Sequence, residues 1–355
     1  MNTWGSKLKI SIFGESHGEG IGMVLDGIPS GITIDTEFIR REMSRRAPGR
    51  DKLSTPRKEA DEVEILSGIF NGKTCGTPIC GIIRNTNTRS KDYTPNLLRP
   101  GHADFTGFMK YSETHDYRGG GHFSGRITAP LVFAGAIAKQ VLACDGIKIG
   151  CHIKSIHGIE EKSFLDCELS DSLLAEISAK SFPVMDDSIG DAMQKEIIDA
   201  SADKNSVGGI IECAVWGIKA GLGSPFFASV ESLISSMMFS IPAVKGIEFG
   251  RGFELCDMTG FEANDPFVTD GAKIFTATNN NGGINGGITN GMPIIFSVAI
   301  KPTPSIAKAQ NTVDTDSMTN TTIEINGRHD PCIVQRAAVV VECAAALAIL
   351  ESKMI

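Results

Sequence analysis

The sequence has few of the features that mark proteins acting on nucleic acids, metals or membranes. Aromatic residues make up only 6% of the 355 residues, and the formal net charge is −8. An acidic chain with two tryptophans and three tyrosines is poorly suited to RNA or to an anionic membrane surface. The nine cysteines form no CxxC pair and no metal-ligand spacing. This pattern predicts no metal site and free thiols in a reducing cytoplasm.

The sequence also lacks a recognisable export or membrane segment. The first seven residues, MNTWGSK, contain no hydrophobic signal core. The longest apolar stretches lie around 129–138 and 343–350, and neither reaches the roughly 18–20 residues of a membrane span. We therefore expect a soluble, cytoplasmic protein with no membrane partner.

Glycine and apolar residues are plentiful, since there are 39 glycines and 41% of the chain is hydrophobic. Runs rich in Val and Ile and bounded by Gly or Pro predict strands. These runs are Lys9–Phe13, Ile21–Leu25, Val63–Leu66, Ile79–Ile83, Gly209–Trp216, Gly246–Phe249 and Pro293–Ile300.

Three residues predict the starts of helices. Asp35 is a cap for a helix to about Arg45, and Thr128 is a cap for a helix over 129–143. Asp330 precedes Pro331, a good first helical residue, and predicts a helix that includes 337–350. A further stripe of apolar residues recurs at helical spacing, and we expect it to pack in the hydrophobic core rather than to contact a ligand. It consists of Phe226, Phe227, Val230, Leu233, Ile234, Met237 and Met238.

Strands and helices are interspersed, and glycine-rich turns outnumber long helices. The sequence therefore predicts a mixed α+β fold, with helices packed between antiparallel sheets. No linker divides the chain, so we expect a single domain over 1–355. Residues 160–206 are the most polar and least patterned, which makes them a possible peripheral insertion.

The string FGESHG follows the first predicted strand, and its glycines expose Ser16 and His17 on a turn. The spacing does not match the Gly-x-Ser-x-Gly elbow, which argues against a serine nucleophile. His17 is the better candidate, as a proton donor, because imidazole titrates near neutral pH. The alternative is a structural histidine in a turn.

A basic segment follows, with eight Lys and Arg residues between Arg40 and Lys58. Its centre, RRAPGR, resembles an anion clamp because guanidinium groups bind phosphate oxygens two at a time. A solvated basic loop is the alternative.

The densest motif joins RPGHAD to HDYRGGGHFSGR. Three successive glycines allow backbone N–H groups to approach a phosphate or a flat ring. Arg126 precedes a helix N-terminus, and His102 follows a rigid turn that suits a leaving phosphate. The motif is neither a Walker loop nor a GxGxxG fingerprint. A glycine-rich hairpin with surface charges is the alternative.

Near the C-terminus, Lys301 supplies a charge, and Thr303 and Ser305 supply hydroxyls for a phosphate or a ribityl chain. Asp330 is the natural cap of its helix. A capping carboxylate can also act within a site, so the two roles are compatible.

Eight strings in order resemble the signature segments of the chorismate synthase family. They are FGESHG, RRAPGR, RPGHADF, DYRGGG, AVKGIEFG, GGINGGI, KPTPSI and GRHDPC, and they span residues 13–332. The resemblance implies a lyase that converts 5-enolpyruvylshikimate 3-phosphate to chorismate and phosphate by 1,4-anti elimination with reduced FMN. That step belongs to the shikimate pathway of aromatic amino acid biosynthesis. A βαβ-sandwich fold, a homotetramer and NADPH as a candidate reductant are also implied.

The resemblance assigns roles to individual residues. It implies that His17 protonates reduced flavin, that His102 assists phosphate departure, and that Asp330 helps remove the substrate proton. Positions matching substrate or NADP contacts are Arg40, Arg46, Lys52 and Arg126. Positions matching the flavin site are His122, Phe123, Ser124, Pro242, Ala243, Gly286, Lys301, Pro302, Thr303, Pro304, Ser305 and Arg328.

One departure concerns the residues after the triple glycine. Many family members continue as GGRSSARE, whereas this chain reads GHFSGRIT over 121–128. Ser124 and Arg126 are kept, while His122 and Phe123 differ from the family's pattern. Two other functions stay open: an NADPH-dependent flavin reductase, and a non-catalytic flavin-binding protein.

Overall fold

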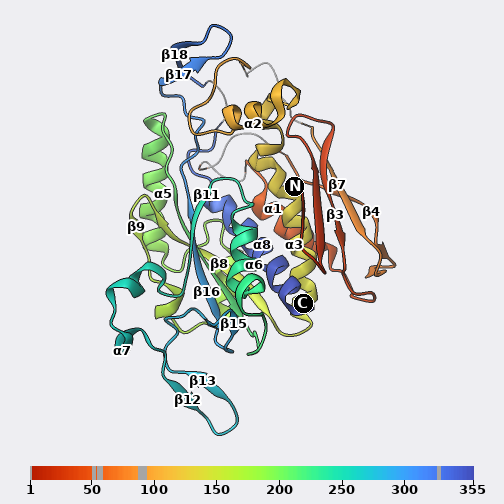
Figure 1. Ribbon diagram of the computed structural model, residues 1–355, viewed down its shortest axis with the longest axis vertical. Coiled ribbons are helices and arrows are strands. Elements are labelled where there is room, and N and C mark those ends of the chain that lie inside the picture. The colour runs from red at the N-terminus through yellow and green to blue at the C-terminus, as the bar shows by residue number, and fades with distance from the viewer. Residues whose placement is uncertain (1, 50–52, 54–58, 87–93, 326–328) are drawn as a thin grey trace.

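Two antiparallel sheets enclose a layer of helices in the computed structural model, which describes residues 2–49, 53, 59–86, 94–325 and 329–355 (Figure 1). The first sheet has the order β1 (Thr3–Trp4), β2 (Lys9–Gly14), β3 (Gly20–Asp26), β7 (Ile79–Arg84) and β4 (Val63–Ser67). The second has the order β11 (Val244–Phe249), β16 (Ile294–Ile300), β10 (Gly209–Trp216), β8 (Lys148–Ile156) and β9 (Ile159–Glu160). The predicted α+β class with sandwiched helices is confirmed, and each predicted strand is present.

Four helices fill the space between the sheets: α1 (Thr36–Arg46), α3 (Thr128–Ala143), α6 (Val230–Met238) and α8 (Val334–Met354). Helices α3 and α8 are buried on almost every side, so their sequences are apolar all round rather than striped. They pack closely at Gly135, where an added Cβ would lie 2.2 Å from the Cβ of Cys343. The segment Gly125–Ala143 is long and apolar enough to span a membrane, contrary to expectation. However, 78% of it is buried inside the protein, as in a core helix.

One of the three predicted helix caps is confirmed. The Asp35 carboxylate accepts hydrogen bonds from the backbone N–H groups of Glu37 and Phe38 at the start of α1. Thr128 instead lies inside α3, and its hydroxyl donates to the Gly125 carbonyl. Helix α8 begins only at Val334, so Asp330 does not cap it.

The stripe from 226 to 238 is only partly core. Val230, Ile234 and Met237 of α6 are buried, but the side chains of Phe226 and Phe227 are 83% and 96% exposed. These two residues belong to a short 3-10 turn before α6, where the helical spacing no longer applies. The prediction that they lie in the core is therefore wrong for this chain.

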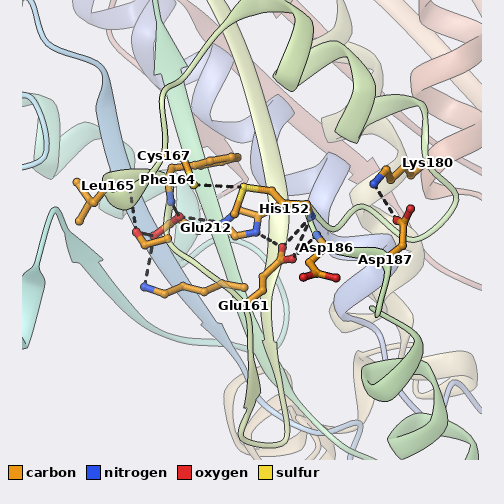
Figure 2. A network of polar contacts seen from close by, with 12 residues as sticks. His152, Glu161, Phe164, Leu165, Cys167, Lys180, Asp186, Asp187 and Glu212 are labelled. Atoms are coloured by element: carbon orange, nitrogen blue, oxygen red, sulfur yellow. Dashed lines mark hydrogen bonds and ion pairs between the residues drawn. The ribbon is translucent and has the colours of Figure 1, made fainter. Parts of the chain in front are cut away.

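Residues 160–206 form α4 (Asp171–Ala179) and α5 (Asp187–Ala202), which pack on the outer face of the second sheet. A buried histidine, His152 of β8, lies at this junction (Figure 2). Its Nε2 lies 2.9 Å from a carboxylate oxygen of Glu212 in the neighbouring strand β10, and its Nδ1 is bonded to Glu161. Glu161 in turn accepts from the backbone N–H groups of Met185 and Asp186. The network ties this segment to the sheet.

Smaller elements project from this frame. The helix α2 (Asp104–Tyr111) and the hairpin β17–β18 (Gln310–Asp314, Thr319–Ile323) lie at the upper end in Figure 1. The hairpin β12–β13 (Phe267–Thr269, Ile274–Thr276) and the short helix α7 (Gly260–Ala263) lie at the lower end. The remaining strands among the described residues are the short pairs β5–β6 (Ile69–Phe70, Lys73–Thr74) and β14–β15 (Ile284–Asn285, Ile288–Thr289).

Candidate active site

The loop between β2 and β3 carries His17, whose residue is only 9% exposed. Its neighbour Ser16 donates its backbone N–H to the Gly121 carbonyl at 3.1 Å. The His122 ring, through Nδ1, lies 2.8 Å from the Gly14 carbonyl at the end of β2. The loop with His17 is therefore fastened to the triple glycine from both sides.

The three glycines 119–121 adopt left-handed backbone angles, with φ of 62°, 81° and 53°. A Cβ at Gly119 would lie 2.6 Å from Nε2 of His17, and a Cβ at Gly120 would lie 3.2 Å from Nε2 of His102. A side chain at Gly119 would clash with the His17 ring and one at Gly120 would crowd the His102 ring, and the positive φ angles also favour glycine. Two histidines 85 residues apart in the sequence thus meet at adjacent glycines.

The turn that carries His102 is joined to the segment 301–305. The Lys301 ammonium donates to the Gly101 carbonyl, and a Cβ at Gly101 would lie 3.4 Å from Pro304. Lys301 also donates its backbone N–H to the Ala243 carbonyl at 3.0 Å. Burial and the nearby Lys245 lower the pKa of Lys301. Lys301 and Pro304 therefore lie beside the turn that carries His102, and Ala243 lies beside Lys301.

Arg46 and Arg126 share a buried carboxylate. Arg46 donates from Nε to Asp61 at 2.8 Å, and Nη1 of Arg126 contacts both Asp61 and, at 3.2 Å, Glu59. Burial raises the pKa of Asp61, but the two guanidiniums outweigh burial and hold that pKa below its ordinary value. Burial lowers the pKa of Arg126, against the effect of Asp61. The two predicted anion-binding arginines already have protein counter-ions, because burial requires them.

Asn85 connects this arginine pair to the loop of His17. Its side-chain oxygen accepts from Nε of Arg126 at 3.0 Å, and its amide nitrogen donates to the carbonyls of Glu15 and Gly18. On the other side, Arg336 of α8 donates to the Arg46 carbonyl at 2.9 Å and to the Asp330 carboxylate at 2.6 Å. One continuous set of contacts therefore runs from Asp330 to His102.

Comparisons with known proteins show to which family the chain belongs. A family profile for chorismate synthase matches residues 8–354. The chorismate synthase of Dehalococcoides mccartyi is 46% identical over 343 residues, which cover 96% of this chain and 93% of that protein. The chain belongs to the chorismate synthase family. The family enzyme of Thermococcus kodakarensis is 44% identical and aligns with 98% of this chain and 96% of its own length. A crystal structure of a chorismate synthase superposes with a TM-score of 0.77 at 30% identity, covering 98% of this chain and 92% of that one.

Membership makes the chain an enzyme, and the chorismate synthase family acts in the shikimate pathway. The family in general requires a reduced flavin. Two buried hydroxyls, one next to His17 and one at an expected flavin position, bear on whether such a polar cofactor fits. Ser16 Oγ, against Gly119, and Thr303 Oγ1 are buried and have no hydrogen-bond partner among the described residues. Hydroxyls left in this state suit a ligand with oxygen and nitrogen groups, such as a flavin.

The structure gives contacts or burial for most of the other residues expected from the chorismate synthase resemblance. Ser124 accepts from the Arg126 backbone, and Phe123 packs near Tyr111 of α2 with ring centres 6.3 Å apart. Pro302 lies beside Gly208, and Ser305 is buried. Lys52 and Arg328 lie outside the described residues.

Two expected residues lie apart from the cluster. Arg40 is on the exposed face of α1, where it pairs with Glu37. Gly286 is in the turn between β14 and β15, toward the opposite end of the molecule from α2 (Figure 1). Arg45 precedes Arg46 in the string RRAPGR, but both of its terminal guanidinium nitrogens donate to the Glu342 carboxylate of α8. Arg45 is therefore paired within the protein and is not a candidate for binding a ligand.

Several residues of this site were not singled out from the sequence. Glu59, Asp61, Asn85 and Arg336 gave no local signal, because each is an ordinary polar residue whose partner is distant in the chain. Asp104 and Arg99 lie within the quoted string RPGHAD, so their spacing around His102 could have identified them.

Proposed function

We propose that this chain forms chorismate from 5-enolpyruvylshikimate 3-phosphate by a 1,4-anti elimination of phosphate, with reduced FMN bound. The observation that supports it best is the meeting of His17 and His102 at Gly119 and Gly120. Both imidazoles contact the same short backbone segment through the edge that carries Nε2. Two proton-carrying groups are thereby available to one bound substrate.

His102 donates a proton from Nε2 to the departing phosphate oxygen, because its other nitrogen is already engaged by Asp104. His17, at the adjacent Gly119, carries the second proton on the side proposed for the flavin. Asp330, which accepts a hydrogen bond from Arg336, helps to remove the proton that the substrate loses. Reduced FMN supplies electron density to the carbon framework from which the phosphate departs.

The buried arginines provide preorganised hydrogen-bond donors, and their charges are balanced by Asp61 and Glu59. Arg46 and Arg126 are held side by side by Asp61, so their orientation is set before a substrate arrives. Fixed donors of this kind stabilise charge that develops on a leaving group without reorganisation during the reaction. Lys301 adds a cation at the turn before His102.

The flavin site is proposed along residues 122–124, 242–243 and 301–305. Lys301 offers a charge for the FMN phosphate, and Thr303 Oγ1 and Ser16 Oγ offer hydroxyls for its polar groups. NADPH is proposed as the source of electrons, with Arg46 among its contacts. NADPH consumption without the phosphorylated ester would favour the flavin reductase alternative.

A homotetramer in the cytoplasm is also proposed. Large apolar side chains on peripheral elements are between 73% and 96% exposed, which is typical of surfaces that another subunit covers. They are Phe226, Phe227, Phe253, Phe261, Phe267 and Ile274. Sedimentation velocity should give about four times the 37.8 kDa chain mass, and a monomer would contradict the proposal.

The test is phosphate release from the enolpyruvyl ester under anaerobic conditions, with FMN reduced by dithionite. We expect wild-type protein to release phosphate, and His17→Ala or His102→Ala to lower kcat by about 10²-fold or more. His157→Ala is the matched control, because the His157 side chain is 65% exposed and is paired with Glu196, away from the glycine segment. Wild-type rates in both site variants would overturn the proposal.

A further inference from the structure

His102 is held by an aspartate and an arginine of its own turn. Its Nδ1 lies 2.7 Å from an Asp104 carboxylate oxygen. Arg99 donates to both oxygens of the same carboxylate, from Nε at 2.8 Å and from Nη2 at 2.7 Å. The Arg99 backbone N–H adds a third hydrogen bond at 3.0 Å. The carboxylate of Asp104 is therefore fixed in direction before it meets the imidazole.

The contacts decide which ring nitrogen carries a proton. Burial raises the pKa of Asp104, but hydrogen bonds from His102 and Arg99 outweigh burial and hold that pKa far below its ordinary value. An ionised carboxylate only accepts hydrogen bonds, so Nδ1 of His102 must donate to it. The Arg99 guanidinium also lies 3.2 Å from Nδ1, but two donors cannot bond each other. The 2.7 Å contact with Asp104 therefore sets the proton on Nδ1.

The contacts of Asp104 do not favour a structural role as a helix cap. The residue opens α2, yet its carboxylate makes no cap hydrogen bond to the helix, and Ala103 at the cap position makes none either. Its oxygens are directed backwards, to Arg99 and His102. With Nδ1 engaged, Nε2 faces Gly120, where an added Cβ would lie 3.2 Å away.

We propose that Asp104, supported by Arg99, is a positioning residue that acts through His102 by keeping Nδ1 protonated and Nε2 aimed at the glycine segment. The proposal rests on the proposed function, in which Nε2 of His102 serves the departing phosphate. An imidazole with its second nitrogen held by a carboxylate keeps one orientation and one tautomer.

The test is a double-mutant cycle with Asp104→Asn and His102→Ala in the anaerobic phosphate-release assay. We expect Asp104→Asn to lower kcat by about 10²-fold while KM changes less than about threefold. In the His102→Ala background, Asp104→Asn should cost nothing more, because its effect passes through the missing ring. Asp166→Asn is the matched control, since Asp166 pairs with Arg251 and contacts no histidine in the described residues.

Each outcome has a distinct meaning. Wild-type activity in His102→Ala would overturn the proposed function of that residue. A slow His102→Ala with a normal Asp104→Asn would overturn only the positioning role. A further loss when the two changes are combined would show that Asp104 acts structurally, and would also overturn it. Should Asp104→Asn fold poorly, ¹⁵N chemical shifts of the His102 ring in wild-type protein decide the question, because a ring without a proton on Nδ1 contradicts the proposal.

Discussion

Replacing Glu342 by Gln should destabilise the protein strongly, because this carboxylate balances two cations in the middle of the helical layer. Glu342 of α8 is fully buried. It accepts from Arg45 of α1 at 2.6 and 2.7 Å and from Lys139 of α3 at 2.8 Å. Glu42 completes the cluster, so that two positive and two negative groups cancel. The network joins α1, α3 and α8 at one point.

The size of the effect follows from the charges. Burial raises the pKa of Glu342, but Arg45 and Lys139 outweigh burial and lower that pKa to about 2. A carboxyl whose pKa is lower in the folded protein stabilises the fold at every pH above its pKa in the unfolded chain. The contribution of Glu342 is therefore fully present at neutral pH and is lost as the pH falls toward 2. Glu342→Gln leaves one excess buried positive charge. Removing one partner of a buried pair costs about 3–5 kcal/mol.

The assay is urea unfolding followed by circular dichroism at pH 7, at one protein concentration. Glu64→Gln is the matched control, because its pair with Arg84 is exposed, and we expect no change in its midpoint. Adding Lys139→Met to Glu342→Gln restores charge balance and should recover about half of the loss or more. A loss below about 1 kcal/mol for Glu342→Gln, or simple addition of the two single losses, would refute the reasoning.

Two further predictions concern the core and pH dependence. Gly135→Ala should lower the free energy of unfolding by about 1–3 kcal/mol, because the new Cβ would lie 2.2 Å from Cys343 and a helix-propensity gain of about 1 kcal/mol does not offset that clash. Gly260→Ala is the control and should be neutral, because an added Cβ there meets no other atom within 4 Å. Equal urea midpoints for the two variants would contradict the prediction. Burial lowers the pKa of His152, but Glu161 and Glu212 outweigh it and raise that pKa above its ordinary value. The stabilisation from His152 is therefore complete below its unfolded pKa and declines as the pH rises through the folded one. The midpoint difference between wild type and His152→Gln should shrink from pH 6 to pH 9, and a constant difference would contradict the assignment.

Local sequence patterns determined much of the fold. The strand β10 and the cap Asp35 follow from alternation, composition and hydrogen bonding within a few residues, so no distant contact was needed to predict them. The starts of α3 and α8 were missed by one and by several residues. In α8 the cap position is Ile333, and Asp330 bonds the side chain of Arg336, a contact that a local pattern does not reveal.

The motifs around His17, His102 and the triple glycine were also readable from the chain, because clustered histidine, arginine and glycine have few structural uses together. That His17 and His102 contact adjacent glycines was decided by the sheet and the loop packing. Sequence pattern likewise could not tell that Arg45 is neutralised by Glu342 while Arg46 is neutralised by Asp61.

The sequence by itself determined which segments form strands and helices and which residue types carry the chemistry. Tertiary structure alone decided which charges are buried together, and hence which arginines pair with protein carboxylates. The physical reason is desolvation: a buried charge needs a partner within a few ångströms, and that partner is chosen by packing between segments as far apart as residues 45 and 342.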